Sequence, residues 1–129
     1  MNFLSHFLLV AVLFAAVDSI WIGLVANKFY KKQLGSLLRP KPAFAPAVLF
    51  YVLYVAAMVV LVINPALVED SLQKALGYGA LFGLASYAAY DLTNASTLKN
   101  WPKAVTIIDL LWGTFVTAVV CGISFAILQ

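Results

Sequence analysis

The chain has 129 residues, of which 64% are hydrophobic and 10% are charged, and its formal net charge is +3. Soluble domains average about 45–50% apolar and about 25% charged residues, and a small domain in water buries only part of its surface. The composition therefore excludes a soluble globular protein and predicts one domain, residues 1–129, whose solvent is lipid.

Four apolar stretches predict membrane-spanning helices at residues 3–25, 44–63, 75–98 and 104–128. Each has close to the ~20 residues that cross ~30 Å of hydrocarbon at ~1.5 Å per residue. The third gives the weakest signal because it turns polar from Tyr87 onward. The first lacks the positively charged start of a signal peptide, so we expect it to be retained. The predicted fold class is an all-α membrane protein, a four-transmembrane-helix bundle.

Basic residues concentrate in two of the three predicted connections. The first connection carries Lys28, Lys31, Lys32, Arg39 and Lys41, and the third carries Lys99 and Lys103. The second has Lys74 against Glu69 and Asp70. Cytoplasmic loops are enriched in Lys and Arg, so we expect the first and third connections in the cytoplasm and both the N and C termini outside. We expect the first connection to contact membrane lipids with anionic headgroups, and we expect no nucleic-acid partner.

The first connection also has a helical pattern, because Tyr30, Leu34, Leu37 and Leu38 recur at helical spacing with the lysines largely elsewhere. Such a pattern is typical of a short interfacial helix that lies on the membrane surface. A merely basic loop fits equally well, and the sequence leaves both interpretations open.

Small residues recur every four positions in three of the predicted helices. The rows are Ala11, Ala15, Ser19 and Gly23 in the first helix, Ala75, Gly79 and Gly83 in the third, and Gly113 and Thr117 in the fourth. Small residues at this spacing let helix backbones approach closely in lipid. We therefore expect these rows to mark the inward faces of their helices.

Three of the five acidic residues, Asp18, Asp91 and Asp109, lie inside the predicted helices. An acidic side chain in hydrocarbon costs a few kcal/mol even on mild insertion scales, and such residues usually face a polar interior, find partners or serve a function. Counted from the helix ends, all three lie ~8–12 Å inside the cytoplasmic boundary. We therefore hypothesise that they share a pocket in the cytoplasmic half of the bundle.

Polar and aromatic residues accompany the acids. Tyr87, Tyr90 and Asn94 lie near Asp91 in the third helix, and Trp21 and Trp112 each follow an acid by three residues. Carboxylates in one pocket need a cation, protons or hydrogen bonds to neutralise them. The predicted ligand-binding residues are Asp18, Trp21, Tyr87, Tyr90, Asp91, Asn94, Asp109 and Trp112.

Other chemistries have little support in the sequence. The single cysteine, Cys121, excludes an internal disulfide and a cysteine cluster, and the single histidine, His6, lies far from the acids along the first helix. The motifs Gly-x-Ser-x-Gly and His-x-x-x-His do not occur. We expect no metal and no cofactor.

Four separated motifs carry a resemblance to a known family. They are DSIWIG at residues 18–23, KKQLG at 31–35 with RPKP at 39–42, YDLTN at 90–94 with TLK at 97–99 and Trp101, and DLLWG at 109–113. The chain resembles, over essentially its whole length, a bacterial family of small four-helix inner-membrane proteins that carries only a domain-of-unknown-function label. The resemblance implies a multi-pass protein of the bacterial inner (cytoplasmic) membrane and implies no particular reaction.

The residues favour a binding or transport module whose ligand is cationic, hydrogen-bonding or lipid-like. Four helices are few for a transporter that alternates access, so transport would need a homodimer. One alternative is an intramembrane lipid-modifying enzyme or its accessory subunit, with an aspartate as acid or base. The other is a structural or assembly protein whose acids only join helices. The sequence does not decide whether the protein is an enzyme.

Overall fold

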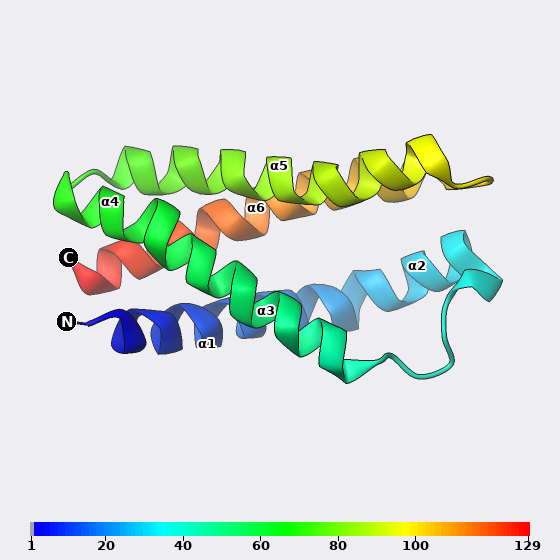
Figure 1. The fold of residues 1–129 in the computed structure, drawn as a ribbon, viewed down its shortest axis with the longest axis horizontal. Coiled ribbons are helices and arrows are strands. Elements are labelled where there is room, and N and C mark those ends of the chain that lie inside the picture. Colours follow the sequence, from blue (N-terminus) through cyan, green and yellow to red (C-terminus); the bar gives the residue numbers. More distant parts are fainter. Residues whose placement is uncertain (1) are drawn as a thin grey trace.

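The structure, a computed structural model, describes residues 2–129, and the regular elements in this range are helical. They are α1 (Phe3–Trp21), the π-helical turn η1 (Ile22–Ala26), α2 (Asn27–Leu34), the 3-10 turn η2 (Gly35–Leu37), α3 (Phe44–Met58), the π-helical turn η3 (Val59–Ile63), α4 (Asn64–Val68), α5 (Leu72–Thr97) and α6 (Lys103–Leu128). Because consecutive elements run on without a break, the described chain forms four long helical rods (Figure 1). The predicted all-α, four-helix class is confirmed.

Each rod reverses the direction of the one before it (Figure 1). Both termini and the α4–α5 turn lie at one end, and the connection at residues 38–43 and the α5–α6 turn lie at the other. Three rods, Phe3–Leu37, Phe44–Val68 and Lys103–Leu128, are long and apolar enough to cross a membrane. The remaining rod, α5, is as long as α6 and packs against it, so it lies within the same bundle although its sequence is more polar.

We call the end with the 38–43 connection the basic end, because it carries seven of the eight Lys and Arg residues. These are Lys28, Lys31, Lys32, Arg39, Lys41, Lys99 and Lys103. The opposite, terminal end carries Lys74, which forms an ion pair with Glu69.

The first rod is longer than predicted. The helix does not end at residue 25 but continues through η1 into α2, which gives a 35-residue helix, Phe3–Leu37. Of the two expected alternatives, the merely basic loop is wrong. The expected helix is present as α2, but it continues directly from the first rod, because residues 22–34 contain no proline and the α-helix ends only at Gly35, whose φ is +52°. At about 1.5 Å per residue this rod is ~52 Å long. Its lysine-bearing end therefore extends past a hydrocarbon core of ~30 Å.

The most extensive helix contact joins α5 and α6. A Cβ atom added at Gly83 would collide with the carbonyl oxygen of Gly113, and one added at Gly79 would lie 3.1 Å from the Cβ of Cys121. A Cβ atom at Gly113 would collide with the ring of Tyr87. The small-residue rows of the third and fourth helices therefore lie at a close backbone contact, as predicted.

The row predicted for the first helix is wrong. Ala15, Ser19 and Gly23 are exposed, and an added Cβ at Gly23 would meet nothing within 4 Å. The buried residues of α1 are instead His6, Val10, Phe14 and Asp18. This rod packs against α3 and α6 through large side chains, which keep the backbones apart and leave the small residues on the outer face.

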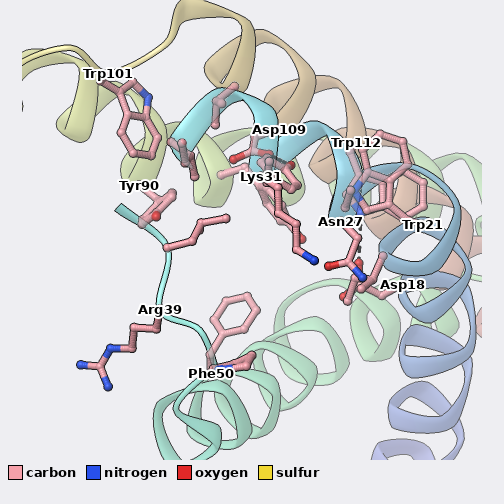
Figure 2. Close-up of a pocket in the computed structure, with 18 of the residues that line it drawn as sticks. Asp18, Trp21, Asn27, Lys31, Arg39, Phe50, Tyr90, Trp101, Asp109 and Trp112 are labelled. Carbon is pink, nitrogen blue, oxygen red and sulfur yellow. Dashed lines mark hydrogen bonds between the residues drawn. The ribbon is translucent and has the colours of Figure 1, made fainter. Parts of the chain in front are cut away.

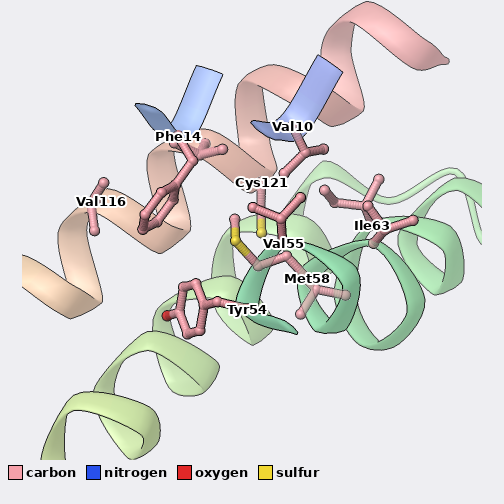
Figure 3. Close-up of a cluster of buried hydrophobic side chains, with 11 residues drawn as sticks. Val10, Phe14, Tyr54, Val55, Met58, Ile63, Val116 and Cys121 are labelled. Carbon is pink, nitrogen blue, oxygen red and sulfur yellow. The ribbon is translucent and has the colours of Figure 1, made fainter. Parts of the chain in front are cut away.

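An apolar core joins α1, α3, η3 and α6 (Figure 3). Its buried members are Val10, Phe14, Tyr54, Val55, Met58, Val59, Val62, Ile63, Val116, Val120 and Cys121. The hydroxyls of Tyr54 and Thr117 are 2.7 Å apart inside this core and join α3 to α6. Cys121 is a buried free thiol, so it packs here as a small apolar side chain.

The core does not extend to the basic end. There α3 contacts α1 through Tyr51. Its contacts with α5 lie further along the same rod, at Tyr54, whose ring centroid is 5.0 Å from that of Phe82, and in η3. Residues 38–50 are all exposed, and Figure 1 shows the first turns of α3 diverging from α5. The basic end is therefore less closely packed than the rest of the bundle.

Gly83→Ala tests the α5–α6 contact against Gly77→Ala, a control on the same helix where an added Cβ meets nothing within 4 Å. Replacing glycine by alanine inside a helix normally stabilises by roughly 0.5–1 kcal/mol, so Gly77→Ala should match or exceed the wild-type melting temperature in detergent. Gly83→Ala should lower it, because overpacking costs roughly 1–3 kcal/mol. Equal melting temperatures for the two variants would contradict the close contact.

Candidate functional site

A cavity of about 780 Å³ lies at the basic end, bounded by the four rods and the 38–43 connection (Figure 2). This volume is within the roughly 300–1,000 Å³ typical of small-molecule sites. Its polar, charged and aromatic lining residues are Asp18, Trp21, Asn27, Tyr30, Lys31, Arg39, Phe50, Ser86, Tyr87, Tyr90, Trp101, Asp109 and Trp112. All three tryptophans of the chain are among them.

Most of the residues predicted from the sequence meet in this cavity. Asp18, Trp21, Tyr87, Tyr90, Asp109 and Trp112 line it, whereas Asp91 and Asn94 do not. The structure thus brings two of the three intramembrane acids to one space and leaves the third apart. That these residues bind a ligand stays a prediction.

Asp18 is held by two aromatic donors from different helices. The indole Nε1 of Trp112 on α6 donates to Oδ1 at 3.1 Å, and the hydroxyl of Tyr51 on α3 donates to Oδ2. Only 8% of Asp18 is exposed. Because both of its oxygens accept hydrogen bonds from other rods, Asp18 joins α1, α3 and α6 at the wall of the cavity.

The two tryptophans that follow acids in the sequence lie face to face. The rings of Trp21 and Trp112 stack with their centroids 4.4 Å apart and their planes 8° apart. This contact fixes the plane of the Trp112 indole, whose N–H must point at Asp18. Trp21 is therefore part of the cavity wall and supports the donor from α6.

Asp109 has a different partner. The hydroxyl of Tyr30 on α2 donates to its Oδ1, and 8% of Asp109 is exposed. A carboxylate offers about four acceptor sites, so this bond leaves Asp109 with acceptor capacity toward the cavity. Lys31 and Asn27 line the same cavity as Asp109 and Asp18 (Figure 2).

The π-helical turn η1 brings Tyr30 to the cavity. In an uninterrupted α-helix, at about 100° per residue, Tyr30 would lie roughly 120° around the axis from Asp18. The extra residue that a π turn absorbs reduces this difference to roughly 20°. The same rotation buries Ala26 in the cavity wall. Because no residue type marks a π turn, the sequence pattern placed Tyr30 on a surface helix instead.

Asp91 is the most buried of the three acids. None of its surface is exposed, and neither carboxylate oxygen has a hydrogen-bond partner among the described residues. It shares a face of α5 with Ala75, Gly79 and Gly83, the face that meets α6. The three acids accordingly form no common cluster, and residues 2–129 contain no group of three or more His, Cys, Asp or Glu arranged to hold a metal ion.

Several lining residues were not among those predicted from the sequence: Asn27, Tyr30, Lys31, Arg39, Phe50, Ser86 and Trp101. From the sequence, Lys31 and Arg39 were expected only to contact lipid headgroups. A usable signal did exist, because Lys31, Arg39 and Trp101 belong to the motifs that carry the family resemblance. Lys31 and Arg39 are exposed at the edge of the cavity, whereas the two acids are buried. The site therefore combines an inner pair of carboxylates with an outer pair of cations.

A family comparison agrees with this description of a membrane bundle. Residues 3–126 match the family described as "Predicted membrane protein (DUF2177)", and the chain belongs to that family. The match confirms the resemblance to a membrane family without an assigned reaction. The chain matches no curated protein and no solved structure.

A double-mutant cycle tests the bond between Tyr51 and Asp18. Asp18→Asn and Tyr51→Phe, made singly and together, should show a coupling of roughly 0.6–1.7 kcal/mol in the free energy of unfolding, the range found for hydrogen bonds between membrane helices. Asp18→Asn paired with Tyr90→Phe is the control, because Tyr90 is an exposed lining residue on α5. This control pair should be additive. Equal couplings in the two cycles would contradict the assigned bond.

Asp91→Asn tests whether the third acid stabilises the fold. Because neither Asp91 oxygen is hydrogen-bonded, the variant should have a free energy of unfolding equal to or above that of the wild type. Asp18→Asn should instead lose roughly 1–3 kcal/mol, because it disturbs a satisfied carboxylate. Unfolding of the Asp91→Asn protein under conditions that the wild type tolerates would show that the carboxyl group has a stabilising partner.

Proposed function

We propose that the cavity binds a ligand with a cationic or hydrogen-bonding group and a lipid-like apolar part, and that the protein holds or transports this ligand in the membrane. The observation that carries the proposal is the presence of two buried carboxylates, Asp18 and Asp109, in one cavity. Each such group costs a few kcal/mol in a membrane. A bundle that only had to span the bilayer would not need two such groups in one space.

The lining supports this choice of ligand. Ligand sites are mainly apolar with a few convergent polar groups, and here the aromatic rings of Trp21, Phe50 and Tyr87 line the same cavity as the two acids. Aromatic faces attract cations, and they do so more strongly away from water. Carboxylates and aromatic rings together therefore favour a positively charged or hydrogen-donating group over an anion.

A structural role is a second candidate for one of the two acids. Both oxygens of Asp18 already accept hydrogen bonds from the protein. The role of Asp18 as a link between helices is therefore sufficient to explain why this acid is buried here. Asp109 accepts one hydrogen bond, from Tyr30. Asp109 is therefore the acid that we assign to ligand binding, with Asp18 supporting the wall.

The membrane placement is part of the same proposal. The basic end would face the cytoplasm of a bacterial inner membrane, with both termini outside, following the excess of Lys and Arg in cytoplasmic loops. The exposed lysines of α2 would then contact anionic lipid headgroups. Transport by alternating access would require a homodimer, because one bundle has only four rods.

The test is to extract the protein together with native lipid and to identify retained molecules by mass spectrometry. The wild type should retain a specific molecule in constant proportion to protein, and Asp109→Asn should lose it. Glu69→Gln is the matched control, because it makes the same acid-to-amide change at the terminal end. If Asp109→Asn retains the same molecules as Glu69→Gln, the cavity is not a ligand site and the acids serve the fold.

A further inference from the structure

We infer that the ligand is a phospholipid whose headgroup carries a primary amine, of the phosphoethanolamine type, and that it reaches the cavity sideways from the leaflet at the basic end, between α3 and α5. This inference rests on the proposed function and names the ligand class of that site.

The sideways route follows from how α3 is packed. Its first turns diverge from α5 (Figure 1), and residues 38–50 are exposed. Phe50 on α3 and Tyr90 on α5 line the cavity and are 45% and 59% exposed. The cavity is thus bordered here by side chains that also face the hydrocarbon. An acyl chain can lie against this apolar border while its headgroup occupies the cavity.

The acceptors inside the cavity select the amine. A primary ammonium has three N–H donors, and the oxygens of Asp109, Asn27 and Ser86 lie in one lining to accept them. A trimethylammonium group has no N–H and would leave these acceptors unmatched. A glycerol headgroup carries no positive charge and would leave the carboxylates uncompensated. The primary amine is the headgroup that satisfies both requirements.

The cations at the edge match the phosphate. Tyr30 donates to Asp109, so Lys31, the next residue of α2, begins beside the same carboxylate and also lines the cavity. Arg39 lines it from the 38–43 connection, and Figure 2 shows its guanidinium directed away from the acids. The negative charge of Asp109 is therefore buried inside the cavity, and the positive charges of Lys31 and Arg39 belong to exposed residues at its edge. This is the order of charges in a headgroup whose amine is turned inward and whose phosphate stays at the membrane surface.

The experiment uses tryptophan fluorescence, because all three tryptophans line the cavity. The full chain is placed in nanodiscs of phosphatidylglycerol that contain increasing fractions of phosphatidylethanolamine or phosphatidylcholine. Phosphatidylethanolamine should change the emission saturably, with a midpoint at a mole fraction roughly tenfold below that of phosphatidylcholine, since a hydrogen bond to a charged group can supply that factor.

Two variants and one control locate the effect. Asp109→Asn should raise the midpoint for phosphatidylethanolamine roughly tenfold. Lys31→Gln changes an exposed residue, which removes concern about folding, and should weaken the response severalfold by loss of the phosphate contact. Glu69→Gln should respond as the wild type does. Emission in pure phosphatidylglycerol verifies that each variant keeps its cavity.

The possible results distinguish a failure of this inference from a failure of the proposed function on which it rests. Equal responses to the two lipids, or a response unchanged by both Asp109→Asn and Lys31→Gln, would overturn the amine-lipid assignment. If phosphatidylethanolamine gives no response while native preparations still retain another molecule that depends on Asp109, the lipid class is wrong and the cavity function stands. If no retained molecule depends on Asp109, both fail.

Discussion

The close approach of α5 and α6 is the contact on which the other polar features depend. In lipid there is no hydrophobic drive for helices to associate, so backbone proximity has to supply the attraction. Gly79, Gly83 and Gly113 provide it, and they hold the least apolar rod within a bundle whose other three rods are apolar enough to span a membrane by themselves. The same contact seats the ring of Tyr87 over Gly113. Tyr87 thereby closes the apolar core on one side and forms cavity wall on the other.

Asp18 marks the level at which the apolar core gives way to the cavity. It is the last residue of the buried α1 row that begins with His6, Val10 and Phe14. Through Tyr51 and Trp112 it binds α3 and α6 at the point where α3 starts to diverge from α5. One turn later η1 rotates the helix so that α2 still faces the same space. A costly buried acid thus fixes three rods around an opening that apolar contacts alone would tend to close.

The sequence was sufficient for the number of helices and for their approximate positions, because hydropathy determines both. It failed where rotation about a helix axis decides the outcome. Tyr30 needed the π turn, which no residue type announces. Asp91 shows the same limit: it continues the four-residue row of Ala75, Gly79 and Gly83 and is buried outside the cavity. Asp109 continues the corresponding row of Gly113 and Thr117, yet it lines the cavity. The row of small residues in the first helix was predicted to face inward, and this was wrong. Large side chains on α1 face the other helices instead and leave the small residues on the outer face.

The basic half of the bundle combines more departures from ordinary packing than the terminal half. Each half contains a π-helical turn and a buried polar group with no partner among the described residues: η3 and Ser124 in the terminal half, and η1 and Asp91 in the basic half. The basic half adds the cavity and the exposed first turns of α3, and in natural proteins local violations of ordinary packing gather at functional sites. A four-helix bundle packed to ordinary interior density has no room for a space of about 780 Å³. The divergence of the first turns of α3 from α5 (Figure 1) is therefore what makes a binding site within so small a membrane protein sterically possible.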